Sequence, residues 1–188
     1  MNQPPILPRG SEPLLANDCT AKTLRQGSCT LVGAGPGDPE LLTFKAARAI
    51  ASATVLLVDD LVNEAVLAHA SPAARIVHVG KRGGCKSTPQ AFIDKMMIQA
   101  VKDGEQVVRL KGGDPFIFGR GGEEVEHLRQ AGIDVQVVNG ITSGLAGMSS
   151  LGAPLTHREH AHGVVFVTGH AKPGDSGTDW AQLAATAR

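Results

Sequence analysis

The segment CTLVGAGPGDPE, residues 29–40, sets the pattern on which the fold prediction rests. An apolar run of strand length, 29–32, leads into a loop of glycine and proline. Asp38 followed by Pro39 then marks the start of a helix, because an aspartate side chain can cap a helix and proline suits its first position. Strand, loop and helix in this order are the beginning of a βαβ unit.

The same order recurs along the chain. Apolar runs, each about the length of a buried strand, occur at 29–32, 54–58, 75–79, 106–110 and 134–138. Helical stretches separate them: Thr88 with Pro89 repeats the helix-start signal, and Gly104 and Gly132 stand where helix C-caps belong. These patterns predict an α/β fold with a mostly parallel five-stranded sheet flanked by helices.

The two ends of the chain are expected to lie outside this domain. Residues 1–27 carry prolines among polar residues without a sustained period, which predicts a disordered or loosely docked tail. The α/β domain is expected over 28–158, with a short helix over 142–151. Residues 159–188 are expected to be a linker and the start of a truncated second α/β domain, with a first strand at 164–168 and a last helical turn or two at 180–186.

Composition excludes several classes of function. Eighteen basic residues balance eighteen acidic ones, so no overall field attracts nucleic acid or an anionic membrane. The three cysteines form no CxxC pair, which argues against a disulfide framework or a structural zinc site. No segment has the apolar core of a signal peptide or the roughly 18 apolar residues of a spanning helix. We expect a soluble, cytoplasmic protein with no nucleic-acid or membrane partner.

The first glycine loop, GAGPGD at 33–38, lies at the carboxyl end of a strand, where α/β sheets bind ligands. A dinucleotide fingerprint would need glycine at its sixth place, where Asp38 stands. Pro36 and Pro39 also remove two N–H donors that a phosphate would need. A cationic or neutral ligand such as S-adenosylmethionine suits this loop better, although a plain tight turn explains the loop alone equally well.

A longer glycine loop, RLKGGDPFIFGRGGEE at 109–124, also joins a strand to a helix. Adjacent glycines let the backbone approach a ligand, and Arg109 and Arg120 are suited to bidentate binding of carboxylates. Glu123 and Glu124 can instead serve as acidic residues that complement a helix dipole. That simpler role is as well supported as a functional one for Glu123, and better supported for Glu124.

Two further clusters follow strands. The segment GKRGGCKS at 80–87 is either a solvated basic turn or part of a site through Lys81; a Walker loop is excluded, because Arg75 and Arg82 occupy two of its required positions. Asp59 and Asp60 end another apolar run, where two adjacent carboxylates are costly unless they are used or solvated. One of the two is expected to point into the site.

The histidine-rich run HREHAH, residues 157–162, suggests a metal site. Its spacing matches neither HExxH nor a zinc pattern, and no cysteine lies nearby. We therefore expect no metal here, and interpret Arg158 as a carboxylate binder.

Taken together, five motifs resemble the tetrapyrrole methylases in order and spacing: VGAGPGDPELLT at 32–43, DDLV at 59–62, GKR at 80–82, VRLKGGDPF at 108–116 and PLTHR at 154–158. The resemblance extends from about residue 29 to the C-terminus, is greatest to the uroporphyrinogen-III C-methyltransferases, and depends most on RLKGGDPFIFGRGGEE. It implies a homodimer of two-domain subunits that hold S-adenosylmethionine and a porphyrinogen in the cleft between the domains. Two methyl transfers would convert uroporphyrinogen III to precorrin-2, the branch point toward sirohaem, cobalamin and haem d1.

The resemblance also implies roles for single residues. The expected catalytic residues are Asp59 as proton acceptor, Lys81 as proton donor, and Arg120. The expected substrate-binding residues are Arg109, Glu123 and Arg158. Contacts with S-adenosylmethionine are expected at seven positions: Pro36, Gly112, Gly113, Asp114, Ile117, Thr142 and Ser143.

One position departs from the family pattern. Members usually carry arginine where this chain has Asp60, which could weaken a salt bridge beside Asp59 or disfavour its ionisation by like-charge proximity.

The implied chemistry fits these residue types. An electron-rich pyrrole carbon attacks a sulfonium methyl without a strong base, so the protein must mainly align the reactants and accept a proton. Basic residues in loops suit a substrate with carboxylates on every side. Three hypotheses follow: a methyltransferase of which this chain is a part; a non-catalytic remnant that binds a ligand or partner; and a nicotinamide-dependent oxidoreductase, which the first glycine loop disfavours. The retained motifs do not separate the first two, because most of the second domain is expected to be missing.

Overall fold

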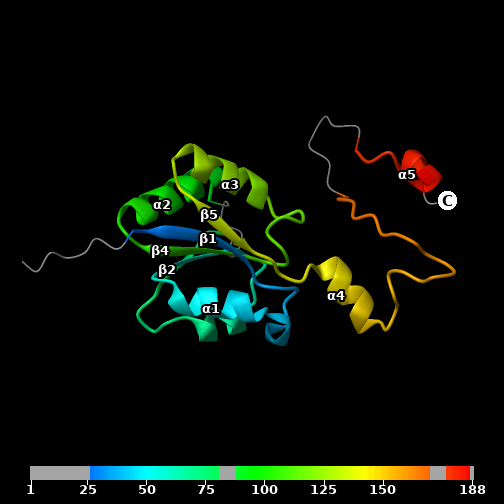
Figure 1. The fold of residues 1–188 in the computed structure, drawn as a ribbon, viewed down its shortest axis with the longest axis horizontal. Coiled ribbons are helices and arrows are strands. Elements are labelled where there is room, and N and C mark those ends of the chain that lie inside the picture. Colours follow the sequence, from blue (N-terminus) through cyan, green and yellow to red (C-terminus); the bar gives the residue numbers. More distant parts are fainter. Residues whose placement is uncertain (1–25, 81–87, 170–176, 187–188) are drawn as a thin grey trace, which may run out of the picture.

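The computed structural model describes residues 26–80, 88–169 and 177–186, and its centre is a five-stranded sheet (Figure 1). The strands are β1 (Ser28–Gly33), β2 (Val55–Val58), β3 (Arg75–His78), β4 (Gln106–Lys111) and β5 (Val135–Val138). Their order in the sheet is β3-β2-β4-β1-β5, and every pairing is parallel. The predicted α/β fold with a parallel five-stranded sheet is confirmed.

Helices cover both faces of the sheet. Figure 1 shows α2 (Gln90–Lys102) and α3 (Gly121–Gln130) on one side and α1 (Phe44–Ser52) on the other, where the 3-10 helix η2 (Glu64–His69) packs beside α1. Two neighbouring residues of β1 face opposite sides of the sheet. Leu31 packs in the core beside α2 and α3, Val32 packs in the core beside α1, and both are fully buried. A strand covered on both faces has an unbroken apolar run, which makes the three inner strands β2, β4 and β1 recognisable in the sequence, whereas the edge strand β3 is largely exposed.

The helix starts agree with the sequence signals in one case and differ by one residue in another. Asp38 accepts a hydrogen bond from the N–H of Glu40 at 2.9 Å and caps the 3-10 helix η1 (Pro39–Leu41), as predicted. At α2, Pro89 is itself the N-cap, and the helix begins at Gln90. Pro89 has an extended ψ of 137°, and its carbonyl accepts the first helical bonds, so the prediction that Thr88 is the cap is wrong by one residue.

The predicted helix ends are confirmed. Gly104 and Gly132 directly follow the C-cap residues of α2 and α3, with φ of 86° and 77°. This left-handed conformation is the one in which glycine commonly ends a helix.

The last part of the chain follows only some of the predictions. The short helices α4 (Ser143–Ser150) and α5 (Trp180–Thr186) form where they were expected. The strand predicted at 164–168 is wrong, because residues 163–168 take no regular structure and Val165 is 66% exposed. A strand exists only through pairing, and no other described segment pairs with this one. Figure 1 shows the segment lying apart from the sheet.

Across the described ranges, the helices are all too short or too polar to span a membrane.

Candidate functional site

A cleft of about 690 Å³ lies at the carboxyl ends of the strands. Loops that follow β1, β2, β3 and β4 line it, together with the starts of α2 and α4. This is the edge at which open α/β sheets bind their ligands.

Most of the predicted site residues meet in this cleft. Six of the seven positions expected to contact S-adenosylmethionine line it: Pro36, Gly112, Gly113, Ile117, Thr142 and Ser143. Asp59, Arg109 and Arg120 line it as well. Asp114, Glu123 and Arg158 are not among the lining residues, and Lys81 lies outside the described residues.

The floor of the cleft is built from glycine backbone in close contact. The N–H of Gly113 donates to the carbonyl of Gly35 at 2.7 Å, and the N–H of Gly35 donates back to the carbonyl of Gly113 at 3.2 Å. A Cβ at Gly140 would lie 2.1 Å from the carbonyl oxygen of Gly113, so no other residue fits without moving the backbone. The two glycine loops and the segment before α4 therefore form one rigid unit.

Asp114 joins these segments from behind the cleft. Its side chain is buried, Oδ1 accepts from the N–H of Phe116 at 2.8 Å, and Oδ2 accepts from the N–H of Gly140 at 3.1 Å and from Asn139 Nδ2 at 3.2 Å. These three bonds use both carboxylate oxygens on the protein itself. Asp114 therefore supports the floor of the cleft, and its contact with S-adenosylmethionine stays a prediction.

A buried charge cluster lies at the inner end of the cleft. Arg109 and Lys111 are two residues apart on β4, so both point to the face that α2 and α3 cover. Arg109 Nε lies 3.0 Å from Glu124 Oε1, and Lys111 Nζ lies 3.3 Å from Glu124 Oε2. The carboxylate of Asp59 approaches the same two cations, at 3.5 Å from Arg109 Nη2 and 3.7 Å from Lys111 Nζ. Two cations and two carboxylates thus meet in one place.

Burial lowers the proton affinity of Lys111 in this cluster. Arg109, Lys111 and Glu124 are at most 4% exposed, whereas the Asp59 side chain is 33% exposed. Desolvation lowers the pKa of Lys111 and the charge of Arg109 adds to this, while Glu124 and Asp59 oppose it. Of the two adjacent aspartates, Asp59 is the one whose carboxylate faces these cations.

Glu124 and Lys111 are the residues whose importance the sequence analysis missed. Glu124 does lie in the first turn of α3, as the preferred interpretation of an acid that complements the helix dipole requires, but its side chain is also fully buried and paired with Arg109, which that interpretation did not include. The available signal was Arg109 and Lys111 themselves. Cations on a strand buried on both faces require a buried anion.

Arg120 and Glu123 occupy the outer rim. Arg120 Nε donates to Glu123 Oε1 at 3.0 Å, and both side chains are more than half exposed. This hydrogen bond is the main cause that raises the pKa of Arg120, so its guanidinium stays charged. Phe118 and Arg120 both have positive φ, at 53° and 56°, a conformation that non-glycine residues adopt mainly in turns and at functional sites. Phe118 lines the cleft, although nothing in the sequence singled it out.

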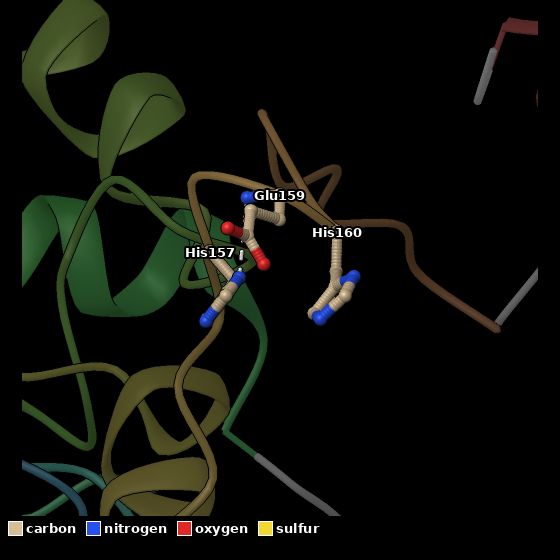
Figure 2. Close-up of side chains that lie close together, drawn as sticks. All are labelled: His157, Glu159 and His160. Atoms are coloured by element: carbon tan, nitrogen blue, oxygen red, sulfur yellow. Dashed lines mark hydrogen bonds between the residues drawn. The ribbon is translucent and has the colours of Figure 1, made fainter.

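The histidine-rich loop lies apart from the cleft lining and carries Arg158 on its exposed surface. Figure 2 shows His157, Glu159 and His160, whose potential ligand atoms lie within 4.8 Å of one another. The two imidazole rings stack at 4.5 Å with planes 14° apart, and His157 Nδ1 accepts from the N–H of Glu159 at 3.2 Å. In nearly parallel rings the in-plane lone pairs do not converge on one point. The expectation of no metal here stays a prediction.

Comparison with known proteins adds independent information. The sequence model of the tetrapyrrole (corrin/porphyrin) methylases matches residues 28–188. The chain is 58% identical over 158 residues to the uroporphyrinogen-III C-methyltransferase of Pseudomonas aeruginosa, covering 84% of this chain and 64% of that protein. It is 50% identical over 159 residues to siroheme synthase 1 of Aeromonas hydrophila, covering 85% of this chain and 34% of that protein. The chain therefore spans less than two-thirds of the length of these relatives.

Two solved methyltransferase structures also match this chain. Uroporphyrin-III C-methyltransferase from Thermus thermophilus, complexed with S-adenosylhomocysteine, matches with a TM-score of 0.67 and 48% identity over 81% of this chain and 60% of that one. A cobalt precorrin-4 methyltransferase matches with a TM-score of 0.68 and 28% identity over 79% of this chain and 59% of that one.

Proposed function

The chain belongs to the tetrapyrrole (corrin/porphyrin) methylase family, and from that premise we propose that it is part of an enzyme that C-methylates uroporphyrinogen III. Two transfers from S-adenosylmethionine would give precorrin-2. The observation that carries this proposal is the cleft at the carboxyl ends of the strands, lined by six of the seven positions expected to contact the methyl donor.

The chemistry of the cleft suits a ligand without phosphate. The N–H groups of Gly35 and Gly113 are bonded to each other's carbonyls, so they are not available to a phosphate. Pro36 has no N–H, and Asp59 brings negative charge to the same space. These features favour S-adenosylmethionine and count against a nicotinamide dinucleotide. Pro36, Gly112, Gly113, Ile117, Thr142 and Ser143 would hold the donor, which when bound supplies a sulfonium methyl group.

The reaction needs a group that accepts one proton. The pyrrole carbon forms a bond to the methyl carbon, the carbon–sulfur bond breaks with its electrons left on sulfur, and the cationic ring then loses a proton. Asp59 is proposed to accept that proton, because of the two carboxylates in the cluster it is the one that lines the cleft, whereas Glu124 is fully buried. Lys81 is retained as the proposed proton donor.

Substrate carboxylates are proposed to bind at the rim. Arg120 is half-exposed on the cleft and paired with an exposed Glu123, so a substrate carboxylate can take the place of Glu123. Arg109 has a different role from the one expected, because its buried guanidinium is already bound to Glu124. It would hold Asp59 rather than grip the substrate. Arg158 stays a prediction as a further carboxylate binder.

The oligomeric state, the localisation, the domain bounds and the pathway are proposed from the family alone. We propose a homodimer in the cytoplasm, with residues 28–158 as the first domain and 159–188 as the link into a second. The product would serve sirohaem, cobalamin or haem d1 synthesis. The second candidate function is a non-catalytic remnant that binds a ligand or partner, which the retained motifs do not separate from the enzyme.

Calorimetry with S-adenosylhomocysteine and a methyl-transfer assay on uroporphyrinogen III test the proposal together. The 188-residue chain is expected to bind weakly and to turn over poorly, because residues of a second domain would complete the cleft. Binding without any transfer would favour the non-catalytic remnant. Submicromolar binding with full turnover would contradict the need for a second domain.

A further inference from the structure

The buried cluster beneath the cleft has a charge balance that depends on Asp59. Arg109 and Lys111 contribute two positive charges, and Glu124 contributes one negative charge. Burial and then the charge of Glu124 raise the pKa of the neighbouring Cys29 thiol to about 12, so this thiol stays neutral. The carboxylate of Asp59 brings the cluster to neutrality, and an unbalanced buried charge is strongly destabilising.

Glu124 contacts both cations from α3, whereas Asp59 follows β2. Besides Arg109 Nε at 3.0 Å, Oε1 accepts from Gln90 Nε2 at 2.9 Å and from Lys111 Nζ at 3.4 Å. Among the described residues Oε2 has no hydrogen bond of good geometry, and its 3.3 Å contact with Lys111 is one of charge alone. Lys111 therefore contacts two carboxylates, the buried one of Glu124 and the partly exposed one of Asp59.

The two cations differ in what else they bind. Arg109 Nη1 also donates to the carbonyls of Leu57 and Leu110, each at 3.4 Å, which attach it to the sheet. Among the described residues, Lys111 Nζ contacts the carboxylates of Glu124 and Asp59. Lys111 is thus the cation whose position depends on those two carboxylates.

We propose that Lys111 is a positioning residue of the reaction: kept in place by Glu124, it keeps the carboxylate of Asp59 directed into the cleft. This inference rests on the proposed function, in which Asp59 accepts the proton. A carboxylate in this position suffices as the acceptor, because the proton leaves a ring that the methyl transfer has made cationic.

Titration of the Lys111 amino group by nitrogen NMR tests the coupling without any substrate. Its pKa is expected below the ordinary 10.5, and lower still in Asp59→Asn and in Glu124→Gln, because each variant removes an anion that raises it. A Lys111 that titrates like a surface lysine, or that is unaffected by Asp59→Asn, would overturn the proposal. The NMR titration does not require methyl transfer. A failure of the proposed role of Lys111 can therefore be told apart from a failure of the proposed methyltransferase function.

The pH dependence of methyl transfer separates positioning from simple structural support. Lys111→Met leaves the buried carboxylate of Glu124 with excess charge, so this variant could fail to fold. The double variant Lys111→Met with Glu124→Gln removes that excess charge and is measured in parallel. Both are expected to lose roughly tenfold in kcat with little change in KM for the methyl donor. The acidic limb of the profile should move to higher pH, since a carboxylate that loses a neighbouring cation binds a proton more readily.

Lys102→Met, at an exposed position in the last turn of α2, is the matched control and should keep the wild-type profile. A folded double variant with wild-type kcat and an unmoved acidic limb would overturn the proposal.

Discussion

Arg109 Nε lies 3.0 Å from Oε1 of Glu124, and neither side chain is more than 2% exposed. This pair joins β4 to the first turn of α3 and lies directly beneath the cleft. We therefore propose that Arg109, expected from the sequence to bind substrate, supports the site instead. The consequences for stability and for function can be measured separately.

Replacement of Glu124 tests whether the buried charge cluster stabilises the fold. Glu124→Gln leaves Arg109 and Lys111 with excess buried charge, and breaking a buried ion pair costs about 3–5 kcal/mol. The free energy of unfolding in urea should fall by an amount of that order. Glu126→Gln, exposed on the same helix, is the control, and an equally small loss in both variants would show that the cluster does not stabilise the fold.

Replacement of Gly140 tests the rigid floor of the cleft. In Gly140→Ala the new Cβ would lie 2.1 Å from the carbonyl oxygen of Gly113, so the backbone must move, at a cost of about 1–3 kcal/mol. Affinity for S-adenosylhomocysteine should fall with the stability. Gly147→Ala is the matched control, because a Cβ there meets nothing within 4 Å. Unchanged affinity in a folded Gly140→Ala protein would mean that the ligand does not use this floor.

Arg120 is expected to act on the substrate rather than on the fold. Arg120→Ala removes a half-exposed guanidinium from the rim, so KM for uroporphyrinogen III should rise roughly tenfold while the thermal stability stays the same. Steady-state kinetics give the answer, with Arg129→Ala, exposed later on α3, as control. A wild-type KM in the Arg120 variant would remove it from the substrate site.

Cys29 gives a prediction that follows from its pKa. Burial raises the pKa of this thiol to about 12, so the reactive thiolate is absent at about pH 8. The peptide that contains Cys29 should resist alkylation in the folded protein and react once the protein is unfolded in denaturant. Mass spectrometry of the digested protein distinguishes the two, and fast labelling without denaturant would contradict the burial of β1.

The fold could largely be predicted because its signals are local. Strands covered on both faces show as apolar runs, and capping residues such as Asp38 act within a few positions of themselves. The order β3-β2-β4-β1-β5 is different, because it depends on which strands lie side by side. The strand expected at 164–168 did not form for the same reason, since pairing is not a property of one segment.

The site could be located but not fully interpreted from the sequence. Six expected donor-binding positions line one cleft, because each follows a strand or begins a helix at the same edge of the sheet. Asp114 bonds to Gly140 behind the floor, and Glu124 reaches Arg109 from another element, so their roles are set by tertiary contacts. Residue type and spacing carry little information about such contacts.

The most direct test of the account is calorimetric titration of this chain with S-adenosylhomocysteine, with a nicotinamide dinucleotide titrated in parallel. We predict weak one-to-one binding of S-adenosylhomocysteine that is lost in Gly140→Ala and kept in Gly147→Ala, and no binding of the dinucleotide. Binding of the dinucleotide, or absence of binding of S-adenosylhomocysteine at millimolar concentration, would contradict it.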